Sequence, residues 1–428
     1  MCDHSKRPAG ATRRGFLKTG GLALFAAGVG GSPAFLARAA AAPQPLGKRK
    51  VLVTIFQRGA MDGLAAVPPL DEKGLRRYRP RLAMSAARSA GDDRLIDLNG
   101  EFGLHPALAP LERLWREGRL GIVHTVGSPD STRSHFDAQD YMETGTPGRK
   151  GTPSGWLNRV CGELGHEASP FRAVAMTSAL PRSFYGDEPA IAVTDLADLA
   201  VTGTHRRGAA VVEGAERGFE RLYEEASEDL LRSTGSETFA ALDLLERLDV
   251  AGYRPRSGVD YPQSPLGRSL RQIAMLIKAE VGLEVAFAES GGWDTHVQQG
   301  TAGGTFARRA ADLAQSIAAF WNDLGALEDD VVLMTMTEFG RTVRENGSGG
   351  TDHGHASCLF VLGNEVDGGK VHGRFPGLSE RVLFEGRDLP ETTDFRSVFA
   401  EVAGGHLRIS DPTQLFPGWS GQRIRLFS

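Results

Sequence analysis

Carboxylates and imidazoles are concentrated in one stretch of this chain, residues 331–357, VVLMTMTEFGRTVRENGSGGTDHGHAS. An apolar run opens the stretch, and Glu338, Asp352 and His353 follow it on either side of a glycine-rich loop. Glycine lets a backbone bend tightly without a Cβ clash, which suits a loop that must fold around an ion. The pattern therefore indicates a metal-dependent site.

Similar groups follow other apolar runs. Asp62 lies in QRGAMDGL, and Asp294 and His296 end ESGGWDTH. Each of these groups alone is typical of a turn or a helix cap. Their repeated position after strands favours a shared site, because ligands bind beyond the carboxyl ends of strands in open α/β sheets. Carboxylates with imidazoles favour zinc, with manganese and iron as alternatives, over calcium or magnesium.

A further polar segment could supply catalytic groups. Thr132, Ser134 and His135 open a predicted helix in STRSHFDAQDYMETG. Hydroxyls beside helix N–H groups can hold an anion, and a nearby metal would turn one into a nucleophile. Helix capping explains the same residues equally well. Arg341 could clamp a phosphate or sulfate or pair with a carboxylate, and Asp352 or His355 could assist proton transfer.

Buried strands alternating with helices are expected to position these groups. Apolar runs without polar alternation indicate strands buried on both faces, hence a parallel sheet with helices on both faces. Helices are predicted from His105-Pro106, over 266–280 and over 305–324. The predicted strands are 51–56, 120–126, 172–177, 283–289, 331–337 and 357–363.

The chain divides into a short leader and one domain. Residues 1–39 contain a twin arginine at Arg13-Arg14, a short apolar run and Ala37-Arg38-Ala39, the anatomy of a twin-arginine signal peptide. Residues 40–50 are a predicted linker, and 51–428 a single α/β domain. A charged, helical pattern without strands at 208–262 is interpreted as an insertion. We therefore expect a periplasmic or secreted protein that meets the twin-arginine export machinery.

Charge and composition exclude some functions. The formal charge is −4, and removing 1–39 takes away six basic residues and one acidic residue, which leaves −9. An acidic chain without a basic stripe is a poor candidate for binding nucleic acid. No later segment is long and apolar enough for a stable membrane span. Cys161 and Cys358 remain after the signal, and the sequence leaves open whether they pair or stay free thiols.

Five motifs carry a resemblance to a known family. QRGAMDGL, STRSHFDAQDYMETG, GGWDTH, TEFGRT and GTDHGHA occur in this order. Together with the export signal they resemble the family called domain of unknown function 1501, over about residues 50–425. That family is similar to the alkaline phosphatase and sulfatase superfamily, α/β hydrolases of phosphate and sulfate esters with one or two metal ions and a Ser, Thr or modified Cys nucleophile.

The resemblance implies an alkaline-phosphatase-like fold and a division of roles. A hydroxyl within 131–134 would be the nucleophile. Where the superfamily has Asp-His after a late strand, this chain has Glu338-Phe339, which allows for a single ion and leaves open a scaffold that has lost catalysis. The metal ligands implied are Asp62, Asp294, His296, Glu338 and His353.

Two functional hypotheses follow. The first is a periplasmic metal-dependent hydrolase of phosphate or sulfate esters acting on a small anionic substrate, favoured by the many histidines and aspartates at strand ends. The second is a non-catalytic exported binding or assembly protein that keeps the fold, favoured by Phe339 in place of the histidine.

Overall fold

The structure is a computed structural model that describes most of the chain, namely residues 22–24, 49–84, 94–166, 168–196, 250 and 252–427. Most of the predicted insertion at 208–262, and all of the predicted signal peptide except 22–24, lie outside the described residues. Within the described residues, no helix is both long and apolar enough to cross a bilayer.

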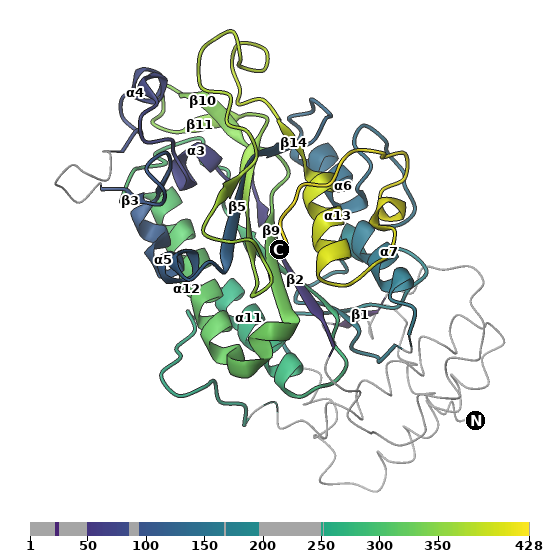
Figure 1. Cartoon of the computed structure of the whole chain (residues 1–428). Coiled ribbons are helices and arrows are strands. Elements are labelled where there is room, and N and C mark those ends of the chain that lie inside the picture. Colours follow the sequence, from purple (N-terminus) through teal and green to yellow (C-terminus); the bar gives the residue numbers. More distant parts are fainter. Residues whose placement is uncertain are drawn as a thin grey trace, which may run out of the picture.

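A ten-stranded sheet forms the centre of the molecule (Figure 1). It is mixed but mostly parallel, which confirms the predicted α/β class. In sheet order its strands are β1 (Leu22–Leu24), β7 (Ile191–Val193), β6 (Ala173–Ala175), β8 (Val285–Gly291), β2 (Val51–Arg58), β9 (Val331–Met336), β12 (Ser357–Leu362), β5 (Leu120–Gly127) and β13 (Val371–His372), with β14 (Thr393–Asp394) also pairing with β5.

The direction of β12 matters for the site. Strands β8, β2 and β9 are parallel neighbours, so their carboxyl ends lie together, with Arg58 beside Gly291 and Phe56 beside Met336. Strand β12 runs antiparallel to both β9 and β5, and its first residue, Ser357, pairs with Val126 near the end of β5. The residues just before β12 therefore lie at the same sheet edge as those that follow the parallel strands.

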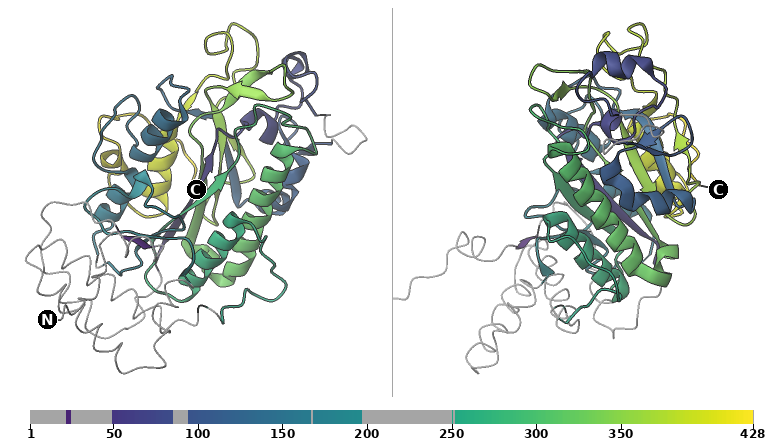
Figure 2. Two further views of the ribbon diagram at one scale, coloured as in Figure 1. Left: turned by 180° about the vertical axis from the view of Figure 1, so that it is seen from behind. Right: turned by 90° about the vertical axis from the view of Figure 1, so that its left-hand side faces the viewer.

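Both faces of the sheet are covered by helices (Figure 1), as predicted. Figure 2 shows α11 and α12 side by side on one face, while α6, α7 and α13 lie on the other. The helices are α3 (Gly63–Ala66), α4 (Lys73–Tyr78), α5 (Glu112–Arg116), α6 (His135–Thr144), α7 (Trp156–Glu163), α11 (Pro265–Lys278), α12 (Thr305–Leu324) and α13 (Phe395–Gly405), with 3-10 turns η1 (Pro106–Leu111), η2 (Arg182–Phe184), η3 (Gly325–Asp330) and η4 (Pro412–Leu415).

Side-chain alternation along β2 divides the core in two. Val53 and Ile55 belong to the hydrophobic cluster beneath α11 and α12, while Leu52 and Phe56 belong to the cluster beneath α7 and α13. All four side chains are buried, as expected of a central strand covered on both faces. Both remaining cysteines are free and buried, one of them, Cys358, in β12 itself.

Two short hairpins lie outside the main sheet. One pairs β3 (Ile96–Asp97) with β4 (Gly103–Leu104), and the other pairs β10 (Arg341–Glu345) with β11 (Thr351–His353). The second hairpin fills the connection between β9 and β12. It therefore stands over the carboxyl edge of the parallel strands and opposes Arg341 to His353.

Candidate metal centre

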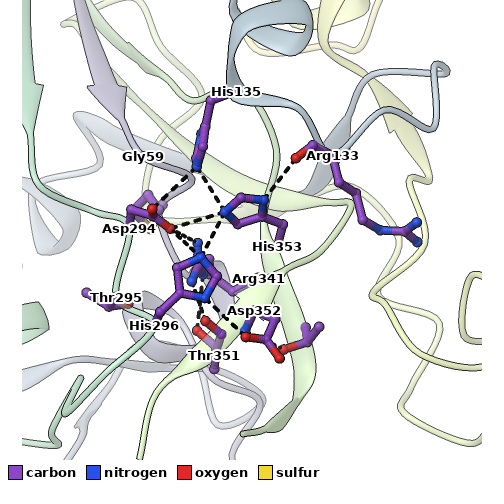
Figure 3. A network of polar contacts seen from close by, with 12 residues as sticks. Gly59, Arg133, His135, Asp294, Thr295, His296, Arg341, Thr351, Asp352 and His353 are labelled. Carbon is purple, nitrogen blue, oxygen red and sulfur yellow. Dashed lines mark hydrogen bonds and ion pairs between the residues drawn. The ribbon is translucent and has the colours of Figure 1, made fainter. Parts of the chain in front are cut away.

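Four side chains from three segments meet at the carboxyl edge of the sheet (Figure 3). His135 is the first residue of α6, Asp294 and His296 lie in the loop after β8, and His353 ends β11. Single ligand atoms of His135, Asp294 and His353 lie within 4.8 Å of one another. We call these four residues the imidazole cluster.

The Nε2 atoms of the cluster point toward one another (Figure 3). Nε2 of His353 lies 3.0 Å from Nε2 of His135 and 2.9 Å from Nε2 of His296. The Asp294 carboxylate lies among them, with Oδ1 at 3.0 Å from Nε2 of His296 and 3.3 Å from Nε2 of His353. Its Oδ2 lies 3.6 Å from Nε2 of His135. Three imidazoles and one carboxylate thus surround one point.

Each of the three rings has an oxygen partner for its other nitrogen. A ring nitrogen that faces a carbonyl or carboxylate oxygen can donate its proton to it, because such oxygens only accept hydrogen bonds, and each Nδ1 has such a partner outside the cluster. The Nδ1 atoms face Oε1 of Glu338 at 2.8 Å from His135, Oδ1 of Asp352 at 3.1 Å from His296, and the carbonyl oxygen of Arg133 at 2.9 Å from His353.

Protons on the three Nδ1 atoms leave the centre of the cluster without a donor from any of its rings. With Nδ1 protonated, each neutral ring presents a lone pair at Nε2. Three lone pairs and a carboxylate then face one another at hydrogen-bond distance, which is repulsive unless a cation or added protons lie between them. Nitrogen and oxygen ligands held by outer hydrogen bonds are the usual form of a protein site for zinc or a related ion.

Glu338 holds His135 in place. Its side chain is fully buried, and Oε1 accepts hydrogen bonds from the backbone N–H of Gly59 and from Nε2 of Gln139, both at 2.9 Å. Burial acts to raise the Glu338 pKa, but the hydrogen bonds from His135 and Gln139 outweigh it and lower the pKa. Its hydrogen bond in turn raises the pKa of His135. Glu338 therefore contacts a cluster residue and does not join the cluster itself.

Arg341 holds Asp294 in the same way. Its guanidinium is buried, donates from Nη1 to Oδ1 of Asp294 at 2.6 Å, and also binds the side chain and carbonyl oxygen of Thr351. Burial acts to raise the Asp294 pKa, but Arg341 outweighs it, so the pKa is lowered and the carboxylate stays charged. Because these contacts occupy Arg341, it positions Asp294 and does not reach toward solvent.

Two glycines allow the segments to approach. Gly59 has a φ of +113°, and a Cβ there would lie 2.6 Å from the backbone nitrogen of Asp294. A Cβ on Gly350, in the turn before β11, would lie 2.3 Å from the carbonyl oxygen of His296. Only glycine fits at both positions, so the ends of β2 and of the β10–β11 hairpin can lie against the loop that carries Asp294 and His296.

Asp62 is placed apart from the imidazole cluster. It caps α3, and its two carboxylate oxygens bind Nη1 and Nη2 of Arg79 at 2.7 Å and 3.0 Å. Gln299 donates to the same carboxylate at 2.6 Å. Asp62 and Arg79 are both almost fully buried. The charge of the Asp62 carboxylate is therefore neutralised by Arg79 of the same chain.

The hydroxyl groups and His355 also have local roles. Ser134 caps α6, with Oγ at 3.5 Å from the backbone nitrogen of Asp137, and Oγ1 of Thr132 accepts from the backbone nitrogen of Ser134 at 3.2 Å. His355 is buried and stacks on Phe384 with ring centroids 4.3 Å apart. Burial, together with the charge of Arg133, lowers its pKa to about 4.

Phe339 lies directly beneath the imidazole cluster. Its ring is buried and packs against His135 and His353, with centroids 4.9 Å and 5.2 Å apart. Phe339 thus forms an apolar wall for two of the rings.

Several contacts of the cluster were not predicted. The carbonyl of Arg133 leaves no mark in a sequence, because every residue has one. Gln139 lies one helical turn after His135 on α6, and this i, i+4 spacing was a signal that could have been found. The structure brings together His135, Asp294, His296 and His353, with Glu338, Arg341 and Asp352 in contact. That any of these residues binds an ion stays a prediction.

Comparison with known proteins places the chain in a family. Residues 49–417 match the family described as "Protein of unknown function (DUF1501)". The chain belongs to the DUF1501 family. No curated protein matches it. A solved structure, "Structure of PH0037 protein from Pyrococcus horikoshii", is similar over 74% of this chain and 88% of that chain, at 12% identity and a TM-score of 0.26. Every residue of the imidazole cluster lies inside the DUF1501 match.

Proposed function

We propose that this DUF1501 protein binds one divalent transition-metal ion at the imidazole cluster and hydrolyses phosphate or sulfate esters in the periplasm. One observation carries the proposal. Three Nε2 atoms and the Asp294 carboxylate converge, while every Nδ1 is held by an oxygen acceptor. A cation at the centre would satisfy all four groups at once.

The donor set favours zinc, with manganese and iron as alternatives. Imidazole suits these ions, whereas magnesium and calcium prefer oxygen ligands. A single ion is the simplest arrangement, because Asp62 already binds Arg79 and the Phe339 ring covers one side of His135 and His353.

The residues around the centre suit hydrolysis. A bound divalent ion supplies Lewis acidity and lowers the pKa of water. Asp294 is 42% exposed, so solvent and a small anion can reach the cluster. Glu338 and Asp352 fix the orientation of their imidazoles, and Arg341 keeps Asp294 ionised. Because the hydroxyls of Ser134 and Thr132 accept backbone hydrogen bonds, we favour water as the nucleophile over either residue.

A non-catalytic metal-binding protein is the second candidate. Three imidazoles and one carboxylate complete a tetrahedral zinc site, and structural zinc sites have four protein ligands where catalytic ones usually have three. A six-coordinate ion in the same place would keep open positions for substrate. The number of ligands thus links the identity of the metal to the function.

Elemental analysis combined with an ester screen tests the proposal. Protein purified from the periplasm should contain about one equivalent of metal, and should hydrolyse an aryl phosphate or aryl sulfate. His353→Ala should lose both the metal and the hydrolysis. The matched control is His372→Ala, a half-buried histidine of β13 that binds the carbonyl oxygen of Asp367 and should change neither. Metal without hydrolysis supports the second candidate, and absence of metal from the wild type overturns both.

A further inference from the structure

A pocket of about 210 Å³ lies beside the β10–β11 hairpin. Tyr78 from α4, Val343 from β10 and Leu383 give it an apolar lining. All three side chains are buried, which makes this lining a fixed surface. The volume suits a small organic group, such as an aromatic ring with one substituent.

The pocket also contains positive charge that no carboxylate neutralises. Arg344 lines it, with its guanidinium carbon 4.8 Å from the centre of the Tyr78 ring. Among the described residues no carboxylate lies within ion-pair distance of Arg344. The lining has two acids, and both have other partners. Glu345 binds Nε of Arg81 at 2.7 Å and the backbone nitrogens of Arg81 and Leu82 at 3.0 Å, while Oδ1 of Asp352 lies 3.1 Å from Nδ1 of His296 and accepts from Nδ2 of Asn346 at 3.0 Å. Arg344 is therefore available to an external anion.

A second arginine joins the pocket to the imidazole cluster. Arg387 lines the pocket, and its Nη2 donates to the carbonyl oxygen of His353. Its Nε lies 3.3 Å from Oδ1 of Asp388, so its charge is partly neutralised. This contact connects the wall of the pocket to the backbone of a cluster residue.

Partly exposed side chains form a continuous path between the two places. Nε2 of His296 lies 3.0 Å from Oδ1 of Asp294 inside the cluster, and its Nδ1 lies 3.1 Å from Oδ1 of Asp352. Asp352 lines the pocket. The side chains of Asp294, His296 and Asp352 are 42%, 38% and 54% exposed. His296, a member of the cluster, thus contacts Asp352 at the edge of the pocket.

We propose that this pocket binds a second anionic group of the substrate. The substrate class is then a small ester with two anionic groups: a phosphate or sulfate ester that lies at the imidazole cluster, and a carboxylate or similar anion on a short apolar spacer that reaches Arg344. The identity of the first group rests on the proposed function. The apolar lining would pack against the spacer, and the guanidinium would pair with the distal anion.

Binding of stable phosphonates tests the pocket without relying on turnover. Calorimetry with the zinc-loaded full chain would compare phenylphosphonate with 4-carboxyphenylphosphonate. The carboxylated compound should bind at least about ten-fold more tightly, as expected for one charge-assisted hydrogen-bonded pair. Arg344→Gln should reduce this preference to less than about two-fold. The control Arg308→Gln changes an exposed arginine of α12 and should keep the full preference.

The outcomes separate this inference from the proposed function. Equal affinities in the wild type, a preference that survives Arg344→Gln, or no binding of the carboxylated compound would overturn the pocket assignment. The two corresponding aryl phosphates are assayed in parallel. A preference in binding without hydrolysis of either phosphate removes the hydrolase proposal and keeps the pocket. If both aryl phosphates are hydrolysed equally and the two phosphonates bind equally, the pocket assignment is wrong and the hydrolase proposal stands.

Discussion

Two polar groupings at the carboxyl edge of the sheet differ in where their positive charge comes from. In one, Asp62 is buried and binds the guanidinium of Arg79, which also donates to the carbonyl oxygens of Thr342 and Val343. Every acceptor there meets a donor of the same chain. In the imidazole cluster, by contrast, the surrounding residues bind the outer nitrogens and leave acceptors at the centre.

The comparison shows how similar residue types serve stability in one place and binding in another. A buried carboxylate that is already paired with arginine has no use for an external ion. In the imidazole cluster, Arg341 pairs with one oxygen of Asp294, but no cation of the chain faces the three Nε2 atoms, so an external ion can bind them. Sequence motifs containing Asp and His do not distinguish these cases, because the deciding group is the donor or acceptor on the other side.

The largest expected effect on stability comes from removing Arg79, the cation that pairs with Asp62. Arg79→Met leaves the Asp62 carboxylate buried without a partner, which should lower the free energy of unfolding by about 3–5 kcal/mol. Urea denaturation measures this. The double variant Arg79→Met/Asp62→Leu should recover a large part of the loss, since no unpaired charge remains. If Arg79→Met is as stable as the wild type, the Asp62 carboxylate does not depend on Arg79, and the contrast with the imidazole cluster fails.

Removing the external cation should have the next largest effect. When the free metal concentration is 100 times the dissociation constant, metal binding raises the free energy of unfolding by about 2.7 kcal/mol relative to the metal-free protein. Urea denaturation with and without EDTA should therefore differ by about this amount in the wild type. No difference is expected in His353→Ala, which lacks a cluster ring. The prediction is contradicted if neither EDTA nor added zinc changes the free energy of unfolding of the wild type.

Loss of an outer hydrogen bond should weaken metal binding without abolishing it. Glu338→Gln replaces the carboxylate that binds Nδ1 of His135, and metal affinity should fall about 10–100-fold. A chelator competition assay measures this. The matched control is Glu289→Gln, because Glu289 binds Arg58 and contacts no imidazole of the cluster. Equal losses in both variants would show that the effect is not specific to the ring.

The smallest effect concerns two buried histidines outside the cluster whose Nε2 atoms face backbone carbonyl oxygens. His124 and His406 are buried, and their Nε2 atoms lie 2.9 Å and 3.0 Å from the carbonyl oxygens of Val67 and Val51. Burial lowers the pKa of each to about 4 from 6.5. Between these values the unfolded state binds more protons, so the free energy of unfolding should fall as the pH drops from about 6.5 toward 4.

A variant isolates this contribution. His406→Asn should reduce the pH slope of the unfolding free energy by up to about 1.4 kcal/mol per pH unit between pH 6.5 and 4. Urea denaturation in EDTA at several pH values measures the slope without the metal. His372→Gln, at a half-buried histidine, serves as the control. An unchanged slope in His406→Asn would mean that this ring is not kept neutral by burial.

Much of the fold could be read from the sequence. The predicted strands at 51–56 and 331–337 correspond to β2 and β9, and the predicted helix at 305–324 corresponds to α12. Long apolar runs and helical periodicity fix such elements locally, so no tertiary information is needed.

The rest depended on contacts that a sequence does not show. Strand β12 has the same apolar pattern as its parallel neighbours, and its reversed direction follows only from pairing with β9 and β5. The choice of Arg79 as the partner of Asp62 likewise depends on the third dimension. The sequence groups His135 with the hydroxyls of its segment, since nothing in its neighbours reveals that Glu338 binds its Nδ1.

The position of β12 has a consequence for the order of assembly. This late strand lies between β9 and the much earlier β5, so the sheet stays divided until almost the whole chain has been synthesised. His353 lies four positions before the start of β12, so the last residue of the imidazole cluster reaches its place only when that gap in the sheet closes. Uptake of an ion would therefore mark a finished molecule, and a truncated or half-folded chain could not acquire one there.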